Sequence, residues 1–97
     1  MTKIKSLQKT ELIFKGLSSS KRLLILDALE KTSLSLSELA EFLHFNLKTA
    51  SSHCQRLESA GLIKKKKKGR KVSHSLTYLG RGMLTIARRT RDLSEKK

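Results

Sequence analysis

The spacing of apolar residues changes at Gly61, and this change limits the folds that the chain can adopt. Before Gly61, apolar residues recur at helical spacing over 36–43 and again over 47–60, with only a short turn at His44-Phe45 between them. After Gly61, apolar and polar residues alternate, as they do in a half-buried strand. Two helices joined by a short turn and followed at once by alternation predict a helix-turn-helix with an attached β-hairpin.

Helix boundaries are marked by residues that can cap a helix. Ser35, with Glu38 three residues later, predicts a capping box at the start of the 36–43 helix. Gly61 predicts the end of the 47–60 helix. Further helices are expected over 7–17, 21–31 and 78–93, and further N-caps at Ser18–Ser20, Asn46 and Thr77.

Five consecutive lysines, Lys64–Lys68, could belong to a disordered tail or to a folded element. They are followed at once by the segment 71–78, whose alternate residues from Val72 to Tyr78 share one side. A free tail would not run directly into a patterned strand. We therefore expect the lysines to form the exposed tip of a hairpin with a turn at Lys68-Gly69-Arg70. Because lysine has low β-propensity, we expect a short first strand.

Charge is distributed unevenly along the 97 residues, whose net charge is +14. Residues 1–61 carry nine Lys and Arg against six Asp and Glu, a net of +3, whereas residues 62–97 carry thirteen against two, a net of +11. This charge favours nucleic acid as the partner, ahead of an anionic membrane surface or acidic proteins. We expect one domain over 1–97, with its core in 14–78 and a C-terminal helix and basic tail in 79–97.

A single cysteine, Cys54, cannot form an internal disulfide, which predicts a reducing compartment. No apolar run has the length of a membrane span, and the first twenty residues lack the apolar segment of a secretion signal. We therefore expect a cytoplasmic, nucleoid-associated protein with no membrane partner. Helical spacing places Cys54 on one stripe with Ala50 and Leu57, which predicts a core residue instead of a redox switch.

The outer face of the 47–60 helix carries short polar side chains and one lysine: Lys48, Ser51, Ser52 and Gln55. An ordinary solvent face usually carries several long charges of alternating sign, so this sparse face could lie close to a flat partner. Such a helix can present polar groups to base edges in a major groove about 12 Å wide. The lysines of the neighbouring hairpin would then contact phosphates. The alternative is an ordinary surface face above a solubilising loop.

Two long segments of the sequence resemble the ArsR-type winged-helix repressors of bacteria and archaea, namely "LSSSKRLLILDAL" and "LSLSELAEFLHFNLKTASSHCQRLESAGLIKKKKKGRKVSHSLT". The resemblance covers about residues 14–78 and needs no gap from Leu36 to Thr77. The segment "LTYLGRGML" also resembles the one that follows the wing in MarR- and PadR-like winged helices. The resemblance implies a winged helix-turn-helix, DNA binding, and dimerisation through the first and last helices.

The resemblance also implies roles for individual positions. Ser51, Ser52 and His53 match the Ser-x-His segment of the family's recognition helix. Lys48 and Thr49 match its N-terminal turn, which usually faces DNA, and Arg70 matches the wing arginine.

Some positions depart from the family's pattern. Cys54 replaces the usual leucine, and Ser35 and Ser37 stand where metal-sensing members have cysteines. The last helix has no Asp-x-His metal pair. The resemblance therefore does not imply metal sensing, and we expect no metal and no cofactor.

These observations together predict an α+β, mostly helical fold: a winged helix-turn-helix with a two-stranded basic wing and N- and C-terminal dimerisation helices. The expected function is a regulator of transcription that binds double-stranded DNA. We expect a homodimeric repressor that reads a pseudo-palindromic operator with its recognition helix (47–60) and lysine-rich wing (62–77). The expected DNA-binding residues are Arg22, Lys48, Thr49, Ser51, Ser52, His53, Gln55, Lys64, Lys65, Lys66, Lys67, Lys68, Arg70 and Lys71. The expected dimer interface is Leu7, Phe14, Leu79, Met83, Ile86 and Leu93.

Several alternatives remain open at this point. Arg22 could contact a phosphate or form a surface ion pair, and His53 could contact the groove or serve the structure. His44 and His74 are expected to be structural, and the arginines 88, 89 and 91 are expected to form a solvated face or to extend the DNA footprint.

Two other functions also fit the pattern: a sequence-tolerant architectural DNA-binding protein, and a monomeric winged helix that binds a protein or an RNA-associated partner. No serine has an evident base and acid beside it, so no enzyme is expected. Nothing in the sequence identifies an effector.

Overall fold

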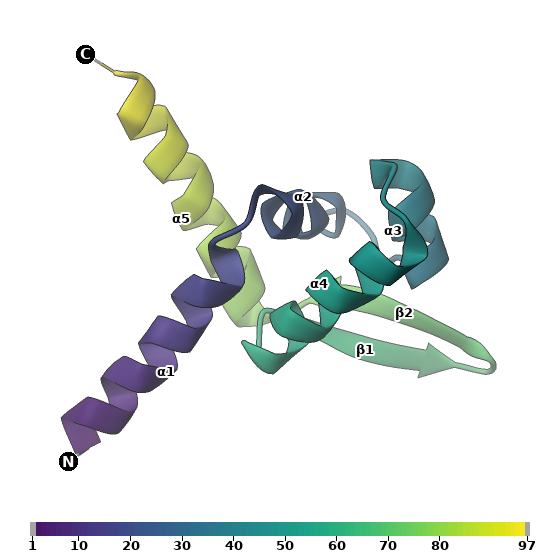
Figure 1. Cartoon of the computed structure of the whole chain (residues 1–97), viewed down its shortest axis with the longest axis horizontal. Helices are drawn as coiled ribbons and strands as arrows, with labels where there is room; N and C mark the ends of the chain where they lie inside the picture. The colour runs from purple at the N-terminus through teal and green to yellow at the C-terminus, as the bar shows by residue number, and fades with distance from the viewer. Residues whose placement is uncertain (1, 97) are drawn as a thin grey trace.

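The computed structural model describes residues 2–96, and describes side-chain surroundings from residue 5 onward. Five helices and one two-stranded antiparallel sheet follow one another in the order expected of a winged helix-turn-helix, so this prediction is confirmed (Figure 1). The elements are α1 (Thr2–Leu17), α2 (Ser20–Ala28), α3 (Leu36–Leu43), α4 (Leu47–Ser59), β1 (Ile63–Lys68), β2 (Lys71–Leu76) and α5 (Tyr78–Glu95).

The predicted N-caps are present at all four expected places. The side chain of Ser35 accepts from the backbone N–H of Glu38 at 3.1 Å, and the Glu38 carboxylate accepts from the backbone N–H of Ser35 at 2.8 Å, which completes the capping box. Each cap satisfies a backbone donor that the first turn of a helix leaves free. The other three caps are Ser19, Asn46 and Thr77.

Apolar side chains of all five helices and of the wing base meet in one core. Its fully buried members include Ile25 and Leu26 of α2, Leu39 of α3 and Leu57 of α4. Burial of each such side chain contributes about 1.5–3 kcal/mol. The core therefore holds α4 between α2 and the wing, while α1 and α5 diverge from the same side of this body (Figure 1).

The first wing strand is longer than predicted. β1 includes all five lysines and pairs with β2 from Ile63↔Leu76 to Lys68↔Lys71, which leaves Gly69-Arg70 as the turn. Gly69 has a φ of 63°, a left-handed conformation that glycine adopts without strain. Strand propensity spans only about 1 kcal/mol per residue, and every lysine here stays solvated, so pairing with β2 outweighs it.

Other boundaries also differ from the prediction. α1 begins at Thr2 instead of residue 7, since nothing in residues 2–6 breaks a helix, and α2 ends at Ala28 instead of Lys31. β2 ends at Leu76, because Thr77 caps α5. As a result Tyr78 lies on α5 with 96% of its side chain exposed, instead of on the inner face of the strand.

Gly80 has a packing role that the sequence did not suggest. Helix propensity alone makes Gly80 and Gly82 two weak points in the first turns of α5. The structure shows that the two glycines have different surroundings. A Cβ on Gly80 would collide with the backbone oxygen of Leu62, whereas a Cβ on Gly82 would meet nothing within 4 Å. Only glycine therefore lets α5 pack directly on the backbone that leads into β1.

Gly80→Ala should lower the free energy of unfolding by about 2–3 kcal/mol, because the new methyl group collides with a backbone oxygen that cannot move alone. Gly82→Ala is the matched control, and it should raise stability by about 0.5–1 kcal/mol. Urea unfolding followed by circular dichroism measures both. Similar effects of the two substitutions would contradict the close packing of α5 on Leu62.

Candidate nucleic-acid interface

The outer face of α4 forms a shallow groove together with the start of α3. The groove is lined by Leu36 and Leu47 and by four predicted site residues: Lys48, Ser51, Ser52 and Gln55. Lys48, Ser52 and Gln55 are exposed and Ser51 is half-buried. Thr49 is also half-buried, and its backbone N–H is held by the Asn46 side chain at 2.8 Å. The structure thus places the predicted polar residues of α4 on one accessible face.

Leu47 belongs to this face but was not predicted there. Its spacing from Ala50 and Cys54 puts it in phase with the buried stripe of α4. The side chain is nevertheless 54% exposed, because it stands on the first turn of the helix, where the core no longer covers it. The spacing of apolar residues does not show where the neighbouring elements end. The exposure of Leu47 could therefore not be predicted from the sequence.

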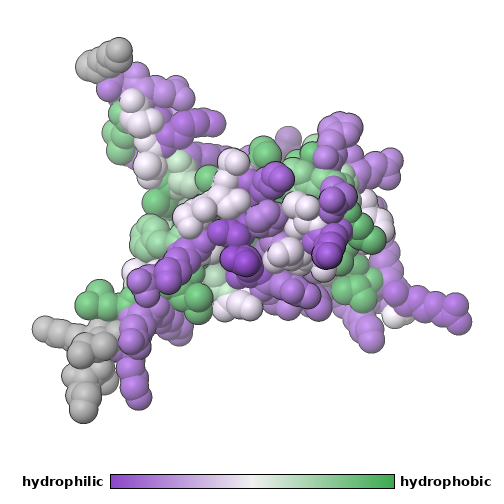
Figure 2. Space-filling view, viewed as in Figure 1, coloured by the Kyte–Doolittle hydropathy of each residue, from purple (hydrophilic) through white to green (hydrophobic). Residues whose placement is uncertain are grey.

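The wing presents its basic side chains on two faces. Lys64, Lys66 and Lys68 lie opposite Ser75, Ser73 and Lys71, so they share the face that points away from the core. Lys65 and Lys67 lie opposite His74 and Val72 on the other face. The wing tip projects from the body as a hydrophilic extension at the lower right of Figure 2.

Two carboxylates reach the basic residues of the wing. Lys65 approaches Glu58 of α4 at 3.9 Å, and Lys71 approaches Glu38 of α3 at 3.7 Å. Both pairs are exposed and contribute little to stability. Among residues 5–96, no carboxylate pairs with Lys64, Lys66, Lys67, Lys68 or Arg70. No internal carboxylate therefore competes with an external anion for these residues.

Arg22 lies on α2, as predicted, but it is buried. Only 8% of it is exposed, and its guanidinium donates from Nε to the Gly16 carbonyl at 2.8 Å and from Nη2 to the Lys15 carbonyl at 3.0 Å. These carbonyls end α1, where the helix itself supplies no donors. The expected surface ion pair is wrong, because no carboxylate among residues 5–96 pairs with Arg22. The phosphate contact stays a prediction, and Arg22 also ties the end of α1 to α2.

His53 joins the same junction from α4. Its Nδ1 accepts from Nη1 of Arg22 at 3.3 Å, which leaves the ring proton on Nε2. Burial lowers the pKa of His53, and the positive charges of Arg22, Lys21 and Arg56 lower it further. His53 does not line the groove. Of the two roles that the sequence left open, the structure supports the structural one, a neutral histidine between α4 and the end of α1.

Cys54 and His74 are buried, as predicted. Burial raises the pKa of the Cys54 thiol to about 11, with a smaller contribution from Glu58, so the thiol stays protonated near neutral pH. The backbone of His74 exchanges two hydrogen bonds with Leu34, at 2.7 and 3.0 Å, and ties β2 to the segment before α3. Burial also lowers the pKa of the His74 ring.

Arg88 corrects the expectation that the arginines of the last helix form only a solvated face. Its guanidinium pairs with Asp27 and with both carboxylate oxygens of Glu30, and so connects α5 to the end of α2. Arg89 and Arg91 remain exposed.

Apolar side chains remain uncovered on α1 and α5. They are Leu7, Phe14, Leu79, Ile86 and Leu93 of the predicted dimer interface, with Leu12 in addition. Green side chains line the edges of both helices where they diverge (Figure 2). Met83 is different, because it is only 8% exposed and packs in the core of its own chain. Its prediction as an interface residue is corrected.

No helix within residues 2–96 combines the length and the apolar character needed to cross a membrane. In the same part of the chain, no three His, Cys, Asp or Glu side chains lie close enough together to hold a metal ion.

A polar-faced second helix of a helix-turn-helix, flanked by a basic hairpin, defines the winged helix-turn-helix class of DNA-binding proteins. Residues 19–65 match the model of the bacterial regulatory protein ArsR family. The matched segment is an ArsR-like helix-turn-helix, the DNA-binding unit of transcriptional regulators. No curated protein matches the chain in sequence.

Solved structures share the fold over nearly the whole chain. The homodimeric winged helix-turn-helix DNA-binding domain of Mb0332 from Mycobacterium bovis is 25% identical, with a TM-score of 0.87 over 93% of this chain and 84% of that one. HlyU from Vibrio cholerae is 26% identical, with a TM-score of 0.77 over 89% and 95%. The transcriptional repressor BigR from Xylella fastidiosa, 18% identical with a TM-score of 0.76 over 99% and 96%, shows the fold alone.

Stability should decrease as the pH falls from 7.5 to 5.5. A histidine whose pKa is lowered by folding takes up a proton more readily in the unfolded chain, so stability is complete above about pH 6.5 and is lost below it. His53→Gln keeps an oxygen acceptor for Arg22 but removes the group that takes up a proton in this range. The substitution should therefore weaken the pH dependence of stability. Urea unfolding at both pH values measures it. Titration of Glu30 and Glu38 falls below this window, because their pKa values are lowered from the usual range.

His44→Asn is the control for this experiment, since His44 is exposed and its left-handed backbone tolerates asparagine. The control should keep the pH dependence of the unmodified protein, which includes the contribution of His74. An unchanged dependence in His53→Gln would contradict the neutral state of His53 in the folded protein.

Proposed function

We propose that the protein is a homodimeric repressor that reads a pseudo-palindromic DNA operator, with α4 in the major groove and the β1–β2 wing on the phosphate backbone. The observation that carries this proposal is that a polar groove on α4, with Lys48 as its one charged residue, lies beside a wing in which most cations lack a carboxylate partner among residues 5–96. This role places the protein on the nucleoid, in the cytoplasm.

The side chains of the α4 groove suit base edges. Gln55 can pair with the N6 and N7 edge of adenine, and the serines can donate to or accept from either kind of base pair. Leu47 adds an apolar surface that fits a thymine methyl group. Lys48, on the first turn, can reach a phosphate or a guanine edge. The face thus offers sequence discrimination, whereas lysines alone would offer affinity only.

The uncovered apolar residues of α1 and α5 support the homodimer. Exposed apolar patches of this kind mark protein interfaces, and the related domain from Mycobacterium bovis is homodimeric. A two-fold axis between two copies would set the two α4 helices into successive major grooves, about 34–36 Å apart.

An architectural DNA-binding protein is the second candidate, because residues 62–97 carry a net charge of +11 and could bind any duplex. The two candidates differ in sequence preference and in the response to salt.

Neutralising the outer face of the wing should weaken duplex binding. In Lys64→Gln/Lys66→Gln/Lys68→Gln, three phosphate contacts are lost, so the slope of log K against log salt should fall by up to about 2.7. A control with three distant substitutions, Lys9→Gln/Lys31→Gln/Lys96→Gln, should keep a slope close to that of the unmodified protein. Fluorescence anisotropy across a salt series measures both, and equal slopes in the two variants would remove the wing from the interface.

The duplex for this experiment comes from rounds of selection on a random pool, with a scrambled sequence of equal composition beside it. Tighter binding to the selected duplex that persists at higher salt supports a sequence-reading regulator. Selection without an enriched sequence would favour the architectural protein, and no binding to any duplex at low salt would exclude both.

Phe14→Glu/Ile86→Glu should convert a dimer into a monomer, because it buries charge where α1 and α5 of two copies meet. Light scattering should then give a mass near 11.0 kDa instead of about twice that value. Phe42→Glu is the control, since Phe42 is an exposed phenylalanine on α3, and it should leave the dimer intact. A monomeric unmodified protein would contradict the two-fold arrangement.

A further inference from the structure

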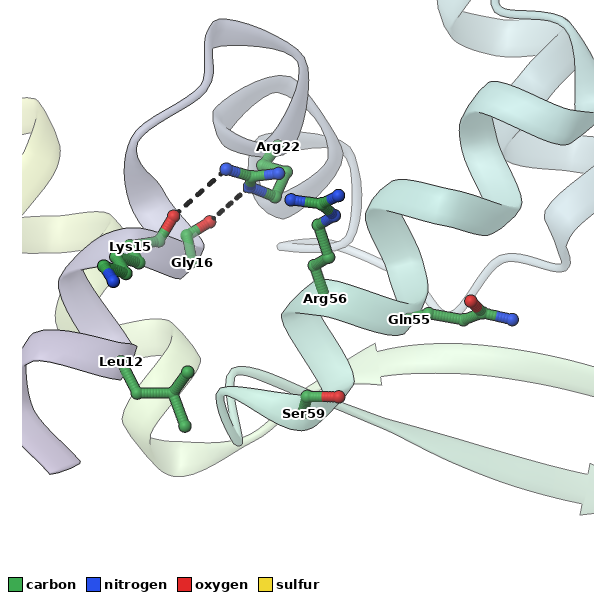
Figure 3. Close-up of a pocket in the computed structure, with 7 residues that line it drawn as sticks. All are labelled: Leu12, Lys15, Gly16, Arg22, Gln55, Arg56 and Ser59. Atoms are coloured by element: carbon green, nitrogen blue, oxygen red, sulfur yellow. Dashed lines mark hydrogen bonds between the residues drawn. The ribbon is translucent and has the colours of Figure 1, made fainter. Parts of the chain in front are cut away.

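A second cavity lies beside the recognition helix, on the side of α1 and α2. Its volume is about 360 Å³, and residues from α1, α2 and α4 line it: Leu12, Lys15, Gly16, Arg22, Gln55, Arg56 and Ser59. Figure 3 shows Arg56 reaching from α4 toward the guanidinium of Arg22 above the space between α1 and α4. Three of the lining residues are cationic, and none is acidic.

The buried wall of this cavity is Arg22. Three of the five N–H groups of its guanidinium donate to Gly16, Lys15 and His53. For the remaining two, residues 5–96 provide no acceptor. Arg22 as a whole residue is only 8% exposed, and a buried arginine with spare donors is a preformed half of an anion site.

Arg56 and Lys15 complete the positive side of the cavity. Both are exposed, and neither pairs with a carboxylate in the described part of the chain. The nearby Glu58 approaches Lys65 of the wing instead, and Asp27 and Glu30 hold Arg88. Burial lowers the pKa of the neighbouring His53, and the charges of Arg22, Lys21 and Arg56 lower it further. None of these three cations forms an ion pair with a carboxylate among residues 5–96.

We propose that this cavity is a binding site for a phosphate group, held by Arg22 from the wall and by Arg56 and Lys15 from the rim. A planar guanidinium with paired donors suits the tetrahedral oxygens of phosphate, and Ser59 and Gln55 offer neutral donors beside it. A water molecule takes about 30 Å³, so the cavity admits a phosphate together with part of its hydration shell.

Two sources can supply this phosphate. Gln55 lines both the cavity and the α4 groove, so a DNA strand bordering the groove would bring a backbone phosphate to the cavity. This source rests on the proposed function. A free phosphate compound is the other source, and it would bind in the absence of DNA.

The first arm of the test uses the protein without DNA. Inorganic phosphate is titrated into ¹⁵N-labelled protein at constant ionic strength, and the backbone signals of α1 and α4 and the Nε–H signal of Arg22 are followed. We expect chemical-shift changes that saturate with phosphate concentration. The affinity for phosphate should be at least tenfold lower in Lys15→Gln/Arg56→Gln. The control, Lys31→Gln/Arg89→Gln, removes the same charge from exposed positions outside the cavity and should bind as the unmodified protein does. Arg22 is left unchanged because it holds the end of α1.

The second arm measures the salt dependence of duplex binding for the same variants. Loss of one phosphate contact should lower the slope by about 0.9 in Lys15→Gln/Arg56→Gln relative to the control. If the slope is lowered but free phosphate does not bind, the cavity holds a phosphate of the DNA backbone. If free phosphate binds but the slope is unchanged, the cavity holds a free phosphate compound. If Lys15→Gln/Arg56→Gln matches the control in both arms, the proposal is overturned. If the unmodified protein binds no DNA, the proposed function fails and the first arm still decides the site.

Discussion

The backbone at Leu62 is the point where the recognition helix, the wing and the last helix are joined. Its N–H donates to the Leu57 carbonyl at the end of α4, and its own carbonyl accepts from Thr77 N–H at 3.1 Å. Thr77 also donates from Oγ1 to the Gly61 carbonyl at 2.7 Å and caps α5, while Gly80 packs against the Leu62 oxygen. A shift at this point would move the wing and α5 relative to α4 at once, so both proposed interfaces depend on it.

A second fastening lies at the other side of α4. Arg22 and His53 hold the end of α1 against α2 and α4, and Arg88 holds α5 against the end of α2. Arg22 satisfies backbone carbonyls that would otherwise lack a donor at the end of α1. The apolar sides of α1 and α5 thereby remain free for a partner copy, and α4 keeps its outer face open.

Positive charge without a carboxylate partner lies in two regions beside α4. The acidic residues pair with cations close to the body, at Glu58–Lys65, Glu38–Lys71 and Glu30–Arg88, whereas the outer wing lysines and the cavity of Arg22 and Arg56 lack carboxylate partners among the described residues. Surface ion pairs of this kind add little to stability. Their distribution leaves two regions beside α4, the outer wing and the cavity at Arg22, whose positive charges are not neutralised by carboxylates of the described residues.

The sequence by itself determined the order of the elements, their caps, the buried stripe of α4 and the hairpin after Gly61, because each depends on residues a few positions apart. Helical spacing, alternation and a capping serine act locally, so they can be read without the fold. Only the tertiary structure decided that Arg22 is buried, that Leu47 is exposed, that Met83 belongs to the core, and that α5 requires glycine at position 80. Each of these outcomes depends on which distant segment lies next to the residue: the end of α1 beside Arg22, for example, or the backbone before β1 beside Gly80. A local sequence pattern does not encode such contacts.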